Sequence, residues 1–129
     1  MKLLVSSYYK SGNINGSSFV KHRFIIFRGV IRNMYKVLLV DDEMIIRQGL
    51  RVLIDWRSLG LEIIGEAENG ESALKLIQEC KPHILITDVK MPKMSGLELI
   101  KKITEMGLNI KTIIISGYND FAYVKEALK

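Results

Sequence analysis

Four short apolar runs, separated by segments with helical periodicity, constrain the fold of this chain more than any other feature. The runs are residues 36–40, 61–67, 84–87 and 111–115. The first is continuously apolar except at its start, as expected for a strand covered on both faces. The second alternates more, which suits a strand at the edge of a sheet.

A helical pattern follows each run. Asn69 is expected to cap the second helix, and Ser95 the third, where Glu98 completes a capping box. Asn119 or Asp120 is expected to cap the last helix. The apolar positions expected to face the core are Ile46, Leu50, Leu53 and Ile54 in the first helix, Ala73, Ile77 and Cys80 in the second, and Phe121, Val124 and Leu128 in the last. Strands alternating with helices predict an α/β, doubly wound fold, because right-handed crossovers permit little else.

The polar residues that interrupt the apolar runs come at their carboxyl ends. Asp41 and Asp42 follow the first run, Asp88 the third and Ser116 the fourth. Ligands bind at this end of the strands in such sheets. Clustered carboxylates are stable only if they are protonated, solvated or occupied by a cation. Since the donors are all oxygens, we predict a hard divalent ion, Mg²⁺, in preference to zinc or iron.

A carboxylate at such a site can also act as a nucleophile and carry a phosphoryl group covalently. Transfer of a phosphoryl group needs positioning and charge neutralisation more than proton chemistry. A metal ion could therefore bridge Asp88 and the incoming group, while Ser116 donates a hydrogen bond to a phosphoryl oxygen. Gly117 leaves this side of the site uncrowded.

Three segments, residues 37–43, 84–96 and 113–118, resemble the motifs of the receiver domain of bacterial two-component response regulators. The resemblance covers residues 35–129 without a gap. It implies a flavodoxin-like parallel sheet of strand order 2-1-3-4 and phosphorylation of Asp88 by a sensor histidine kinase in a phosphorelay.

The resemblance also implies roles for the other site residues. Asp42 would bind Mg²⁺ directly, Asp41 partly through water, and the Lys90 backbone carbonyl would complete the metal site with Asp88. Ser116 would follow the phosphoryl group when the domain switches.

Residues 55–60 and 116–121 are similar to receivers that precede an AraC-type helix-turn-helix domain. This similarity implies that the intact parent regulates transcription and contacts DNA only through an output domain absent from this chain. Family receivers also have a fifth strand and helix and a lysine that pairs with the phosphate; this chain ends before them. We therefore expect an unprotected edge at the fourth strand, uncovered apolar surface, marginal stability and self-association.

Residues 1–33 are expected to lie outside the fold, with Met34 as a natural start of the incomplete receiver, residues 34–129. Six of the 19 basic side chains and none of the 14 acidic ones lie in this extension, so the rest has a net charge of −1 despite +5 overall. Direct DNA binding by the core is therefore not expected. A translated basic arm that contacts nucleic acid or membrane is the alternative.

One cysteine, no secretory signal and no apolar run of roughly 18 residues point to a cytoplasmic protein. An aspartate-nucleophile phosphatase is a rival, but such enzymes usually have an acidic residue where Lys90 stands, so no enzyme is predicted. A receiver-like module that has lost phosphorylation and acts by protein interaction, or an inert fragment, is the other alternative. His83, at the opposite strand end, and Trp56 are interpreted as structural.

Overall fold

The computed structural model describes residues 4–8 and 34–117. Its elements are β1 (Leu4–Tyr8), β2 (Tyr35–Val40), α1 (Met44–Leu53), β3 (Leu61–Ala67), α2 (Gly70–Cys80), β4 (Ile84–Asp88), α3 (Gly96–Glu105) and β5 (Lys111–Ser116). The predicted last helix, with its cap and apolar positions, lies outside the described residues. No helix in the described ranges is long and apolar enough to cross a membrane.

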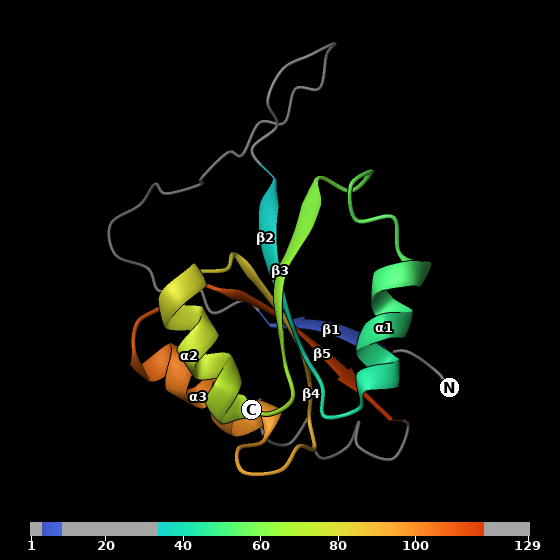
Figure 1. Cartoon of the computed structure of the whole chain (residues 1–129). Helices are drawn as coiled ribbons and strands as arrows, with labels where there is room; N and C mark the ends of the chain where they lie inside the picture. Colours follow the sequence, from blue (N-terminus) through green and yellow to red (C-terminus); the bar gives the residue numbers. More distant parts are fainter. Residues whose placement is uncertain (1–3, 9–33, 118–129) are drawn as a thin grey trace.

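The five strands form one sheet in the order β1-β5-β4-β2-β3 (Figure 1). Strands β2, β3, β4 and β5 pair in parallel. Numbered among themselves, they have the order 2-1-3-4, so the predicted flavodoxin-like arrangement is confirmed. The alternating strand β3 is at the edge, as its sequence indicated.

The other edge differs from the prediction. β1 pairs antiparallel with β5, from Leu4 opposite Ser116 to Tyr8 opposite Thr112. The expectation that the last parallel strand would be an open edge is therefore wrong, because backbone groups of the N-terminal extension pair with it. A domain boundary at Met34 stays a prediction, but the segment before it is not wholly separate from the sheet.

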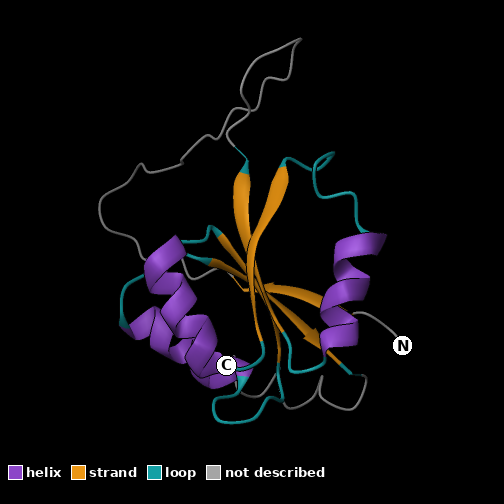
Figure 2. Cartoon of the chain, viewed as in Figure 1, coloured by secondary structure: helices purple, strands orange, loops and turns teal. Residues whose placement is uncertain are grey.

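Helices cover both faces of the sheet: α1 lies on one face, α2 and α3 on the other (Figure 2). The side chains of β2 alternate between these two faces. Its Leu38 and Val40 pack in a cluster with residues of α2 and α3, whereas Val37 and Leu39 point the other way and pack with Leu50 of α1. All four β2 side chains are buried, which confirms a strand covered on both sides.

The helix caps form as predicted. Asn69 accepts a hydrogen bond from the Ser72 backbone N–H at 3.0 Å, and Ser95 and Glu98 form the capping box. Ala73 and Ile77 of α2 are buried, and Cys80 is half-buried.

The first helix is less covered than its pattern suggested. None of the ten residues of α1, all of them described, is fully buried. Leu53 is 85% exposed, so its assignment to the core was wrong, while Ile46, Leu50 and Ile54 are partly buried. The reason is that α1 is the one described helix on its face (Figure 1), and Leu50 is the α1 residue that packs against the buried cluster of Val37, Leu39 and Ile86.

His83 joins strands at the end of the sheet opposite the predicted site. Its ring Nδ1 accepts from the Lys36 N–H at 2.9 Å, and its N–H donates to the Lys36 carbonyl at 2.9 Å. Its own carbonyl accepts from the Lys111 N–H at 3.0 Å. These contacts connect β2 and β5 through the residue before β4, which confirms a structural role for His83.

Candidate functional site

Three carboxylates come together at the carboxyl ends of β2 and β4. Asp41, Asp42 and Asp88 each place one carboxylate oxygen within 4.8 Å of the other two. The cause is the strand register: Val40 lies opposite Thr87, so the residues that follow each are neighbours. Asp41 is buried, Asp42 is exposed and Asp88 is half-buried, so the cluster opens to solvent on one side.

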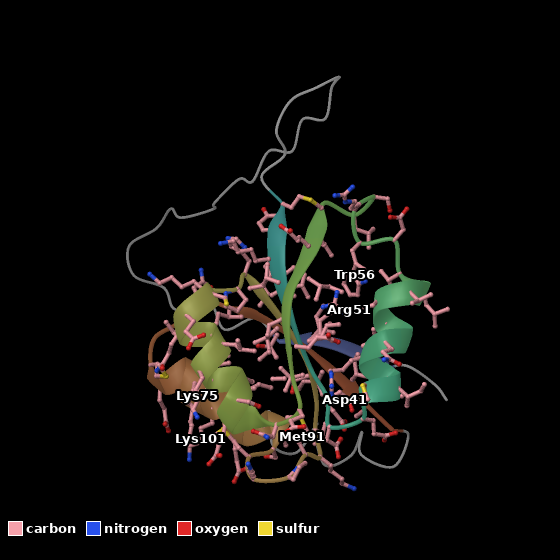
Figure 3. All side chains as sticks on the ribbon, viewed as in Figure 1. Asp41, Arg51, Trp56, Lys75, Met91 and Lys101 are labelled. Atoms are coloured by element: carbon pink, nitrogen blue, oxygen red, sulfur yellow. The ribbon has the colours of Figure 1, made fainter. Side chains whose placement is uncertain are left out.

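Asp41 is held by three hydrogen bonds. Its N–H donates to the Ala67 carbonyl at 3.0 Å, and its Oδ1 accepts from the Glu43 N–H at 2.8 Å. Its backbone carbonyl accepts a hydrogen bond from Nη1 of Arg47. Figure 3 shows its side chain at the lower end of the sheet, beside the start of α1.

Negative charge at this position is disfavoured. Burial raises the pKa of Asp41 to about 6, and repulsion from Asp88, Asp42 and Glu43 adds to the effect, while the hydrogen bond from the Glu43 N–H opposes it. A divalent cation among these oxygens would offset the repulsion. The donor set therefore fits a hard, oxygen-preferring metal ion.

Asp88 is the last residue of β4. Its Oδ1 accepts from the Val89 N–H at 2.7 Å, and its carbonyl accepts from the Thr87 hydroxyl at 2.9 Å. The same carbonyl faces Gly96 so closely that a Cβ there would lie 1.9 Å from it. Gly96 also donates from its N–H to the Val89 carbonyl at 2.9 Å. The start of α3 is thus packed directly against the backbone of Asp88, which fixes where its side chain projects.

The loop between Asp88 and α3 is anchored on its far side as well. The buried Met94 accepts a hydrogen bond through its carbonyl from the Gly70 N–H at 3.1 Å. A Cβ at Gly70 would lie 2.6 Å from Cγ of Met94, so this approach also requires glycine. Lys90 lies exposed in this loop, and the role of its carbonyl as a metal ligand stays a prediction.

Ser116 ends β5 at the same rim. Asp88 lies opposite Ile115 in the register of β4 and β5, and Ser116 is the next residue. The Ser116 side chain is buried, and the following Gly117 is exposed. Ser116 therefore lies at the end of β5 that is next to Asp88, at the same edge of the sheet as the carboxylate cluster, as the strand-end argument predicted. Its contact with a phosphoryl group stays a prediction.

Sequence reasoning missed several residues that shape the surroundings of the cluster: Arg47, Glu66, Thr87, Gly70 and Gly96. Glu66 belongs to this set because its Oε1 lies 3.6 Å from Nε of Arg47. A signal existed for Glu66, because it is a charged residue within an apolar run. The glycines act through close approaches between segments far apart in the chain, which a local pattern does not record.

Comparison with known proteins agrees with this geometry. Residues 37–129 match the response regulator receiver domain. The chain is 52% identical over 96 residues to the transcriptional regulatory protein YesN of Bacillus subtilis, covering 74% of this chain and 26% of that protein. It thus spans about a quarter of this relative's length.

Solved structures show the same fold. The receiver domain of AraT, a response regulator from Geobacillus stearothermophilus, has a TM-score of 0.69 at 44% identity, over 74% of this chain and 76% of that one. A CheY crystallised with CheX, BeF3⁻ and Mg²⁺ from Borrelia burgdorferi has a TM-score of 0.63 at 31% identity, over 73% and 70% of the two chains. With the motifs, the strand order and the acidic cluster already described, these matches show that the chain belongs to the response regulator receiver domain family of two-component phosphorelay signalling.

Proposed function

We propose that this domain accepts a phosphoryl group on Asp88 from a sensor histidine kinase, with Mg²⁺ held by Asp41, Asp42, Asp88 and the Lys90 carbonyl. The observation that carries the proposal is the convergence of three carboxylates from two neighbouring strands within 4.8 Å. Bound Mg²⁺ would supply neutralisation of the charge that builds up as a phosphoryl group approaches these residues.

The chain's own groups account for the positioning of the nucleophile. One oxygen of Asp88 accepts the Val89 N–H, which holds the carboxylate in one orientation. The other oxygen attacks phosphorus, forming the acyl phosphate as the bond from phosphorus to the kinase histidine breaks and the imidazole leaves. Ser116, at the end of the adjacent strand, donates to a phosphoryl oxygen.

The partners follow from this chemistry. The phosphodonor is the sensor kinase, and the effect in the intact parent is control of transcription through an output domain that contacts DNA. The relative YesN, described as a transcriptional regulatory protein, supports this part of the proposal. We place the protein in the cytoplasm, because both the kinase and the DNA target are accessible there.

A second candidate is an interaction module that is no longer phosphorylated. Four exposed apolar side chains of α1 favour it: Met44 is 61% exposed, Ile45 70%, Val52 83% and Leu53 85%. Exposed apolar residues gathered on one short helix can form a surface that contacts a partner. This candidate predicts no covalent modification at Asp88.

Labelling with a small phosphodonor distinguishes the two. The chain is incubated with a radiolabelled acyl phosphate, with Mg²⁺ or with excess EDTA, and bound label is counted after separation. We expect incorporation that depends on Mg²⁺ and is lost in Asp88→Asn, while the matched variant Asp55→Asn, at an exposed aspartate away from the cluster, labels like the unmodified chain. Equal labelling of Asp88→Asn and the unmodified chain would remove Asp88 from its assigned role.

A further inference from the structure

A charged network on the α1 side of the site is not used by the proposed chemistry. Nε of Arg47 lies 3.6 Å from Oε1 of Glu66, and Nε of Arg51 lies 3.1 Å from Oε2 of the same carboxylate. Arg47 also donates from Nη1 to the backbone carbonyl of Asp41. Arg47 thus connects α1 and β3 to the first residue of the acidic cluster, whereas Arg51 reaches only β3.

The burial of Arg47 indicates that this connection matters. Its side chain is 15% exposed, compared with 43% for Arg51. Its buried Nε has no hydrogen-bond acceptor among the described residues, because Glu66 at 3.6 Å is an ion-pair partner only. A largely buried guanidinium is costly unless its contacts compensate. The charge-assisted hydrogen bond to the Asp41 carbonyl is the strongest directional contact available to do so.

That carbonyl belongs to the peptide unit that joins Asp41 to Asp42. The peptide on the other side of Asp41 is fixed by the hydrogen bond from its N–H to the Ala67 carbonyl. With Arg47 in place, both peptide units next to Asp41 are held, and the direction in which Asp42 leaves the strand is fixed as well. Without Arg47, the carbonyl of the second peptide unit loses this hydrogen bond, and the contact from the Glu43 N–H to Oδ1 of Asp41 is left to restrain the turn.

We propose that Arg47 is a positioning residue for the metal site: it holds the Asp41–Asp42 peptide unit in the orientation that lets both carboxylates reach one cation. The inference rests on the proposed function, because it assumes that the cluster binds Mg²⁺. Glu66 acts through Arg47 by keeping the guanidinium directed at the loop.

The sign of the effect separates positioning from simple electrostatics. The guanidinium is a positive charge beside a cation site, so its removal alone would strengthen Mg²⁺ binding. Loss of an oriented ligand set has the opposite effect, and removal of groups that orient metal ligands typically weakens metal affinity by about 10- to 100-fold. Weaker binding after removal of a positive charge therefore identifies positioning.

The test compares Arg47→Gln with Arg51→Gln by calorimetric titration with Mg²⁺. Both variants remove one positive charge that pairs with Glu66, and only the first removes a contact to Asp41. We expect Arg47→Gln to bind Mg²⁺ about 10-fold more weakly and Arg51→Gln to stay within about twofold of the unmodified chain. Hydrogen exchange in the metal-free proteins supplies a second readout, with faster exchange of residues 41–44 in Arg47→Gln alone.

Equal or tighter Mg²⁺ binding by Arg47→Gln, with the unmodified chain binding normally, would overturn the inference and leave the proposed function intact. Absence of Mg²⁺ binding by the unmodified chain would instead refute the proposed metal site, and the inference with it. Where Arg47→Gln does not fold, Arg47→Lys and Arg51→Lys replace the pair. An ammonium cannot donate to Asp41 and meet Glu66 with the same geometry, so weaker binding by Arg47→Lys alone supports positioning, and equal binding contradicts it.

Discussion

Replacement of Asp41 by Asn is expected to stabilise the metal-free domain at neutral pH. Asp41 is 6% exposed and lies beside two other carboxylates. Asn keeps the size of the side chain and an oxygen that can accept the Glu43 N–H, but it carries no charge. The substitution therefore removes the burial and repulsion of the charge while the hydrogen bond is retained.

The magnitude follows from the pKa. Burial raises the pKa of Asp41 from its ordinary 3.8 to about 6, and one pKa unit corresponds to about 1.4 kcal/mol. The full shift is then about 3 kcal/mol, and solvent on the open side of the cluster reduces the expected gain to about 1–2 kcal/mol. The sign is set by linkage: the folded state binds this proton more tightly than the unfolded state does. The contribution of Asp41 to the free energy of unfolding is therefore greatest below pH 3.8, falls as the pH rises to about 6 and is constant above it.

The assay is urea denaturation in EDTA at several pH values between 4 and 8. Asp41→Asn is expected to exceed the unmodified chain in free energy of unfolding at pH 8 and to approach it at pH 4, so the difference grows through the window set by the two pKa values. Glu62→Gln serves as the control, because Glu62 is exposed on β3 and its replacement is expected to change stability by no more than about 0.5 kcal/mol. A loss of stability in Asp41→Asn at pH 8, or a difference that does not depend on pH, would refute the reasoning.

Four further substitutions test the packing around the site by the same denaturation assay. Gly96→Ala places a Cβ against the Asp88 carbonyl and is expected to cost at least about 1–3 kcal/mol; an unchanged midpoint would contradict the close approach. Gly49→Ala, inside α1 with nothing within 4 Å of the added Cβ, is expected to stabilise by about 0.5–1 kcal/mol, and destabilisation would speak against that open space. Leu99→Ala removes a fully buried side chain and is expected to cost about 2–5 kcal/mol, so a loss below 1 kcal/mol would indicate a looser core. Ser95→Ala removes the side-chain cap of α3 and is expected to lower the free energy of unfolding by about 0.5–2 kcal/mol; no loss would show that Glu98 alone is enough to cap the helix.

The sequence predicted the parallel sheet and the meeting of the three carboxylates because both depend on short-range patterns. Each predicted strand starts and ends within one residue of the observed one, for instance 84–87 against Ile84–Asp88. An apolar run has a clear end where a charged residue follows it. The ends of parallel strands then coincide in space through the register alone, so Asp41 and Asp88 could be placed together without coordinates.

The rest could not be predicted because it depends on contacts between distant segments. The hydrophobic pattern of α1 gives a face but not which of its residues the sheet covers, which is why Leu53 was assigned to the core. The pairing of β1 with β5 depends on backbone hydrogen bonds, and the extension shows no strand periodicity. Arg47 is one of several polar residues on a helix, and only the structure shows that it turns back to the Asp41 carbonyl.

The two ends of the parallel strands differ in what their polar groups contribute to stability. At the amino ends, His83 joins β2 and β5 through hydrogen bonds that require no ligand. At the carboxyl ends, the charge on Asp41 opposes folding, because its raised pKa means that the ionised form is disfavoured in the native state. A ligand that binds only the folded state adds about 1.4 kcal/mol of stability at ten times its dissociation constant, which is comparable to the cost of that charge. A cation at this rim would therefore offset a cost that the charge on Asp41 imposes on the metal-free fold, whereas the hydrogen bonds of His83 at the other end of the strands need no ligand.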